Sequence, residues 1–170
     1  MTPVRLLPRL LAFLVDWLVI AAWGGLLFAA VMLATHGKPT PPPGPWAAQA
    51  IGFFSMWLPF VLYFSFLESS RLRASLGKRA VRVVAVGENG ERLSFRQALV
   101  RNAVKLAPWE AGHAVAHQAI FAGDGPLPLW VWGAALIAYG GPLWWIVALF
   151  VSGRTPYDRL ASARVERETP

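Results

Sequence analysis

The sequence contains no cysteine and few charged residues, and both absences restrict what the chain can be. Without cysteine, disulfides, thiolate metal sites and cysteine nucleophiles are excluded. Charged residues make up 15% of the 170 residues, against about 25% in a typical soluble domain, and hydrophobic residues make up 56%. Nine tryptophans fit the same interpretation, because indole rings favour the headgroup region of a bilayer. The composition therefore predicts an integral membrane protein.

Acidic residues are scarce as well, with nine Asp and Glu against 16 Lys and Arg and a formal net charge of +7. In a membrane chain, such an excess indicates retention of basic residues on the cytoplasmic side. We expect these residues to contact anionic lipid headgroups, and we expect no nucleic acid as a partner.

Four segments are predicted to cross the membrane within a single domain that covers residues 1–170. About 20 apolar residues suffice to cross as a helix, and the first run is too long for a signal peptide, so we expect an uncleaved anchor. One of the four segments contains Glu110, His113 and His117, and hydropathy alone rejects it. The predicted spans are residues 10–34, 46–67, 97–122 and 127–151.

The basic residues support the polar third span. Fifteen of the 16 lie in three regions, namely residues 5–9, residues 71–105, which include the start of the third span, and the tail after residue 152. A crossing near residues 97–122 places all three regions in the cytoplasm, with both chain termini. Pro108 is expected to kink or divide this segment, so a re-entrant or interface-lying helix is the alternative. The predicted fold is all-α, a multi-pass bundle of about four transmembrane helices.

The basic region between the second and third spans has the pattern of a small cytoplasmic β-hairpin over about residues 79–95. Residues 79–86 are rich in valine, Asn89-Gly90 is typical of a tight turn, and residues 92–95 form the predicted returning strand. Residues 163–165 of the tail are a candidate third strand. Ser94 and Gln97 have capping-box spacing, which predicts a helix from Phe95.

Asp16 lies within the first apolar run, and Arg9 lies on the same helix face. An ionisable group at that depth costs free energy and is a candidate functional residue. One hypothesis is a proton or cation relay. The other is a structural ion pair that fixes helix register, in which Asp16 contacts Arg9 or an arginine of the loop.

Glu110, His113 and His117 share one face of the third predicted span. They are candidates for a polar ion or proton pathway, for a shared divalent metal, or for packing and headgroup contacts. Their order is not that of a zinc protease, so no hydrolase motif is present. We expect no catalytic residues, no resident metal and no cofactor.

Three separated motifs resemble the RDD family of membrane proteins, named for one Arg and two Asp. Similarity runs from about residue 5 to residue 165. Arg9, Asp16 and Asp158 correspond to the name-giving residues, and Ser162-Ala163 departs from a frequent Gly-Thr. The other motif residues are Gly77, Lys78, Arg101, Asn102 and Arg154. The resemblance implies a multi-pass protein of the bacterial cytoplasmic membrane, with transport suggested for some members.

Asp158 follows the last span and is flanked by basic residues. At i, i+4 spacing it can pair with Arg154, which predicts a solvated salt bridge of little energetic value. Docking of Asp158 against residues 77–79 is the alternative.

Two functions remain open. The chain is either a transport component for a proton or small cation, or a non-catalytic accessory protein that binds a partner through its hairpin and tail. Four short spans are few helices to enclose a pathway, so transport requires a homo-oligomer or a membrane partner. The residues assigned to a pathway are Arg9, Asp16, Glu110, His113 and His117. An intramembrane metalloenzyme is a third, weaker hypothesis.

Overall fold

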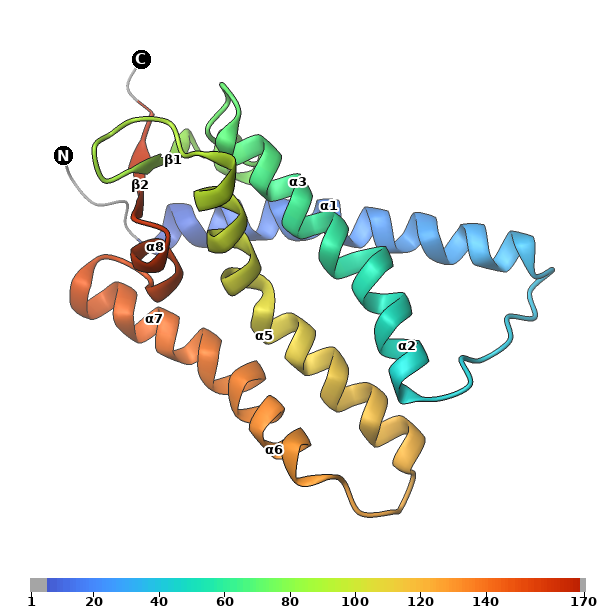
Figure 1. Cartoon of the computed structure of the whole chain (residues 1–170). Coiled ribbons are helices and arrows are strands. Elements are labelled where there is room, and N and C mark those ends of the chain that lie inside the picture. The colour runs from blue at the N-terminus through green and yellow to red at the C-terminus, as the bar shows by residue number, and fades with distance from the viewer. Residues whose placement is uncertain (1–5, 169–170) are drawn as a thin grey trace.

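The computed structural model describes residues 6–168 and contains four helical rods (Figure 1). The first and third rods are the single helices α1 and α5. The second and fourth rods each contain one π-helical turn, η1 and η2, between two α-helical parts. The bounds are α1 Leu6–Ala34, α2 Pro45–Gly52, η1 Phe53–Trp57, α3 Leu58–Ser69, α5 Phe95–Ala122, α6 Leu129–Ala135, η2 Leu136–Gly140 and α7 Gly141–Ser152.

Three of the rods are long and apolar enough to cross a membrane, namely Leu6–Ala34, Pro45–Ser69 and Leu129–Ser152. The predicted helical membrane fold is therefore confirmed. The crossing by α5 stays a prediction, because this helix is not apolar enough to be identified by composition. Its position favours a crossing, since α5 lies between the second and fourth rods and packs against both (Figure 1).

Helix α5 begins as predicted, with a capping box. The Ser94 hydroxyl accepts the Gln97 backbone N–H at 3.2 Å, and the Gln97 side chain accepts the Ser94 backbone N–H at 3.0 Å. Pro108 does not divide the segment, because α5 is one helix of 28 residues. At 1.5 Å per residue it is about 42 Å long, sufficient to span a hydrocarbon core of ~30 Å.

A neighbouring side chain contacts the α5 backbone close to Pro108. The Trp57 indole donates to the Leu106 carbonyl at 3.0 Å. Proline in a transmembrane helix is tolerated where neighbouring helices supply hydrogen bonds of this kind.

The remaining elements form a compact unit at one end of the rods, which we call the cap. It consists of α4 (Leu76–Ala80), β1 (Val83–Gly87), α8 (Pro156–Leu160) and β2 (Ala163–Arg167). The α1–α2 and α5–α6 connections lie at the opposite end from the cap (Figure 1). This arrangement is the one expected if each rod crosses the bilayer once.

The predicted hairpin over residues 79–95 is correct in its turn at Asn89-Gly90, where the Gly87 backbone N–H donates to the Glu91 carbonyl at 2.9 Å, but residues 92–95 do not form the returning strand. Strand β1 pairs antiparallel with β2 in the tail, with Ala85 opposite Val165, and residue 92 makes only an isolated bridge to Val86. The suggested third strand is thus the true partner.

All five residues of β1 are buried, and β2 contributes Ala163 beside Ala85 and Val165 beside Val83. In the predicted returning strand, Leu93 packs on Ala85 but Ser94 already caps α5, so this segment is too short to pair along β1.

A buried charge network at the cap end of the helices

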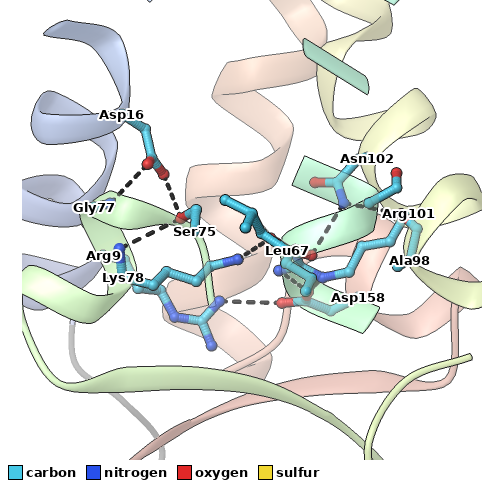
Figure 2. A network of polar contacts seen from close by, with 12 residues as sticks. Arg9, Asp16, Leu67, Ser75, Gly77, Lys78, Ala98, Arg101, Asn102 and Asp158 are labelled. Atoms are coloured by element: carbon cyan, nitrogen blue, oxygen red, sulfur yellow. Dashed lines mark hydrogen bonds and ion pairs between the residues drawn. The ribbon is translucent and has the colours of Figure 1, made fainter. Parts of the chain in front are cut away.

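Five side chains of alternating charge form a continuous buried network where the rods meet the cap (Figure 2). Each comes from a different element, and Arg9 and Asp158, which contact each other directly, lie 149 residues apart in the sequence. In order, they are Arg9 of α1, Asp158 of α8, Arg101 of α5, Glu68 of α3 and Lys78 of α4.

Asp158 connects the two arginines. Its Oδ2 accepts Nη1 of Arg9 at 3.1 Å, and its Oδ1 accepts Nε and Nη2 of Arg101 at 2.8 and 2.7 Å. The Asp158 side chain is fully buried, and that of Arg101 is 2% exposed. Ion pairs removed from water in this way interact far more strongly than pairs on a surface, provided that every charge is satisfied.

Glu68 is the second buried acid and has three partners. Its Oε2 accepts Nη1 of Arg101 at 2.7 Å and Nδ2 of Asn102 at 3.0 Å, and its Oε1 accepts the Lys78 ammonium. The Asn102 amide also donates to the Ala98 carbonyl at 2.9 Å, which fixes its orientation. Glu68 therefore ties α3 to α5 and to the cap.

Asp16 is buried as well, but its partners are neutral. Its Oδ2 accepts the Ser75 hydroxyl at 2.7 Å, and its Oδ1 accepts the Gly77 backbone N–H at 2.8 Å (Figure 2). Ser75 is also the N-cap residue of α4. The carboxylate on α1 thus holds the start of α4 in place.

Gly77 permits this contact because it has no side chain. A Cβ at this position would lie 2.0 Å from the Ala12 carbonyl oxygen and 2.8 Å from the Asp16 carboxylate. The backbone of α4 approaches the backbone of α1 too closely for any other residue. Asp16, Ser75 and Gly77 therefore form one close contact between α1 and α4, which we call the α4 joint.

The structure corrects two predictions about Arg9 and Asp16. They do not pair with each other, since Arg9 contacts Asp158 and Asp16 contacts the α4 joint. Asp16 does contact the loop, as the structural hypothesis expected, but through Ser75 and Gly77 instead of an arginine. The sequence spacing places Arg9 and Asp16 on one face of α1, but the two residues meet different parts of the cap.

The predictions for Asp158 are also wrong. It is buried instead of solvated, and its partners are Arg9 and Arg101 instead of residues 77–79. Arg154 does not pair with it: its Nη2 contacts Glu88 at 2.7 Å and the Ala163 carbonyl at 2.8 Å. Helix α8 begins only after Arg154, so the assumed i, i+4 geometry is absent.

The electrostatics of the cap follow from this burial. Burial alone would raise the pKa of Asp158, but the guanidinium groups of Arg101 and Arg9 outweigh it and lower that pKa below its ordinary value. Burial and the nearby Arg101 lower the pKa of Lys78 to about 8, although Glu68 opposes the shift. Burial and the adjacent Asp158 charge raise the pKa of Tyr157.

Glu110, His113 and His117 lie farther along α5 and form a separate polar group. Gln49 of α2 donates to Glu110, and its Oε1 lies 3.0 Å from Nδ1 of His117. His113 stacks on His117 with ring centroids 6.1 Å apart, and its Nδ1 lies 3.9 Å from Glu110. Within residues 6–168, no three His, Asp or Glu side chains converge in a geometry that would hold a metal.

An aromatic contact lies between the two polar sets. Trp17 of α1 packs on Trp109 of α5 with ring centroids 6.4 Å apart, and Trp109 packs in turn on His113. Arg9 and Asp16 therefore belong to the cap end, whereas the histidines lie on the half of α5 away from the cap, beside the start of the second rod. The five residues assigned to one pathway fall into two groups.

Sequence reasoning assigned no site role to Glu68 of the network or to Ser75 of the α4 joint. Glu68 appears in the sequence only as the residue that ends the second apolar run. An acid at that boundary, a few residues before a basic loop, is the signal that could have found it. Ser75 has a weaker signal, its N-cap position before Leu76-Gly77.

Comparison with known proteins gives one match. A model described as the RDD family matches residues 3–162, nearly the whole chain. No curated protein and no solved structure matches the chain.

Proposed function

The chain belongs to the RDD family of membrane proteins, and from this premise we propose that it is a non-catalytic accessory protein that binds a partner through its cap. The proposal places it in the bacterial cytoplasmic membrane with both termini and the cap in the cytoplasm. The observation that carries it is the buried charge network. Arg9 belongs to this network and Asp16 to the adjacent α4 joint, so both of these residues assigned to a pathway fix the cap on the rods.

Each charged group of the buried network contacts a group of opposite charge. Such a network favours a rigid structure over one through which a proton or ion moves. Arg9, Asp158, Arg101, Glu68 and Lys78 alternate in sign across five elements, so that each of the three cations contacts at least one of the two acids. Asp16 uses both carboxylate oxygens to accept hydrogen bonds from the α4 joint. Proton or ion transfer through these groups would break the contacts that hold the cap, so they support a structural role.

The outer surface of the cap supports the binding role. Exposed arginines outnumber exposed acids there, and two of them, Arg79 and Arg82, flank the end of α4. Complementary charge promotes association and selects partners. The surface therefore fits a partner with an acidic face, and the rigid attachment below it keeps the arginines in a fixed pattern.

Cross-linking in native membranes followed by purification in mild detergent tests this proposal. We expect one protein to be recovered at fixed stoichiometry with the wild type and to be lost with Arg79→Glu/Arg82→Glu. Lys38→Glu is the control, because Lys38 is exposed on the α1–α2 connection at the opposite end. Recovery that varies between preparations, or that ignores the cap substitutions, would contradict the proposal.

A specific observation favours the second candidate function, transport of a proton or small cation. Gln49, Glu110, His113 and His117 form a polar group between two rods. Flux in proteoliposomes would support transport if His113→Ala abolished it while leaving the protein folded. Flux no greater than in empty vesicles would exclude this candidate and leave the accessory role standing.

A further inference from the structure

A cavity of about 460 Å³ lies between α1, α5 and α7, beside the cap. This volume falls within the range of about 300–1,000 Å³ that small-molecule sites occupy. The network described above forms one wall of the cavity, but most of the cavity extends away from it along the rods. It is therefore a separate feature with its own chemistry.

The two ends of the cavity differ in polarity. The walls farther from the cap are apolar and come from opposite rods, including Trp109 of α5 and Pro142 of α7, and Leu10, Phe13 and Ile146 line the side between α1 and α7. The wall at the cap end carries four basic side chains, namely Arg9, Lys78, Arg101 and Lys105. A ligand that fits both ends has an anionic group joined to an apolar chain.

The four cations face three acids, Asp16, Glu68 and Asp158, which leaves one excess positive charge, and in the part of the chain that the structure describes Lys105 is the cation without an ion pair. The other three cations contact Asp158 or Glu68. Within residues 6–168, no carboxylate lies within ion-pair distance of the Lys105 ammonium, which lies 4.6 Å from the Phe64 ring centroid. A lysine ammonium on this wall, at membrane depth, is stabilised by an anionic partner.

The cavity is accessible from the side. Three of its lining residues remain substantially exposed: Leu10 at 44%, Phe13 at 49% and Ile146 at 44%. On apolar helices such as α1 and α7, these surfaces face lipid once the protein is in a membrane. A lipid can therefore enter between the two rods without crossing the cap.

We propose that this cavity binds one anionic phospholipid from the leaflet on the cap side. The phosphate contacts Lys105, and an acyl chain lies along the apolar walls of α1 and α7 and extends through the opening into the bilayer. The direction of the polarity gradient matches that of the bilayer, with the headgroup beside the cap and the chain toward the membrane centre. This proposal does not depend on the accessory role.

Native mass spectrometry in detergent, with either phosphatidylglycerol or phosphatidylcholine added, tests the site. We expect one retained phosphatidylglycerol per chain and at least tenfold weaker retention of phosphatidylcholine. Lys105→Met should weaken phosphatidylglycerol retention about fivefold or more, as expected for loss of one lysine contact to an anionic lipid. Lys38→Met, on the exposed α1–α2 connection at the opposite end from the cap, is the matched control and should leave retention unchanged.

A second variant keeps the proposal testable if Lys105→Met impairs folding. Ile146→Trp retains every charge, affects a partly exposed lining residue and should block the acyl-chain part of the cavity. Equal retention of both lipids, or phosphatidylglycerol retention unaffected by Lys105→Met and Ile146→Trp, would overturn the proposal. Displacement of the lipid by glycerol 3-phosphate alone would also overturn it, because it would identify a site for a soluble anion.

Discussion

Each buried acid at the cap end fixes a different contact between elements. Asp16 accepts hydrogen bonds from neutral donors on α4, Asp158 pairs with arginines of α1 and α5, and Glu68 pairs with cations of α5 and α4. Burying these charges costs free energy, and only the complete set of partners offsets that cost. Removal of one member should therefore cost more than loss of a surface ion pair.

Glu68→Gln should destabilise the protein by about 3–5 kcal/mol, since it leaves Lys78 buried without a counter-charge and removes one of the two carboxylates that Arg101 contacts. Thermal unfolding in detergent measures the effect. Glu91→Gln, on the exposed turn of the cap, is the control and should change stability by no more than about 0.5 kcal/mol. Equal melting temperatures for the two variants would show that the network is not a source of stability.

Gly77→Ala should separate α4 from α1, because the added methyl group would overlap the Ala12 carbonyl. We expect a loss at least as large as typical overpacking, about 1–3 kcal/mol, with faster proteolysis of the 70–82 loop. Gly25→Ala is the matched control on α1, where a Cβ meets no atom within 4 Å. A melting temperature for Gly77→Ala equal to that of the wild type would show that the contact between α4 and α1 does not require a glycine.

The lowered pKa of Asp158 determines how its contribution depends on pH. Above the unfolded-state pKa of about 3.9 this contribution is fully present, and it is lost as pH falls through the lower folded-state pKa. Thermal stability should thus be nearly constant from about pH 7 to pH 5 and should decrease below about pH 4. Asp158→Asn should be less stable at pH 7 and should lose less on acidification, as melting curves across this range will show.

At the scale of elements, the sequence predicted the helices better than their connections. Apolar run length located three rods, and the Ser94–Gln97 box located the start of α5, because both are local signals. The partner of β1 was misassigned, since alternation indicates a strand but not what it pairs with. Local spacing likewise suggested Arg9–Asp16 and Arg154–Asp158, whereas the real partner of Arg9 lies 149 residues away.

The corrected pairing of β1 can be tested by cross-linking, because the chain contains no cysteine. Ala85→Cys/Val165→Cys places two thiols directly opposite each other, so oxidation should join them without loss of the fold. Ala85→Cys/Arg167→Cys, two residues out of register, is the control and should oxidise much less. Rapid oxidation of the control pair, and not of the first, would refute the register.

At the scale of the molecule, the apolar exposed surface and the buried polar residues lie in different regions. Helices α1 and α7 are largely exposed and expose apolar side chains, as expected for lipid contact, whereas the buried polar residues concentrate near the cap. The cavity lies where these two regions meet. Both the accessory role and the lipid site require the cap to lie on one side of the membrane, so both require α5 to cross.

Side-specific labelling of single cysteines in intact cells and in inverted vesicles measures this crossing directly. The four positions are Lys38, Arg92, Asp124 and Arg159, each exposed and each in a different connection or end of the chain. We predict that Lys38→Cys and Asp124→Cys react from the outside, and that Arg92→Cys and Arg159→Cys react only from the cytoplasm. Labelling of Asp124→Cys on the same side as Arg92→Cys would place α5 on one face of the bilayer and contradict the account.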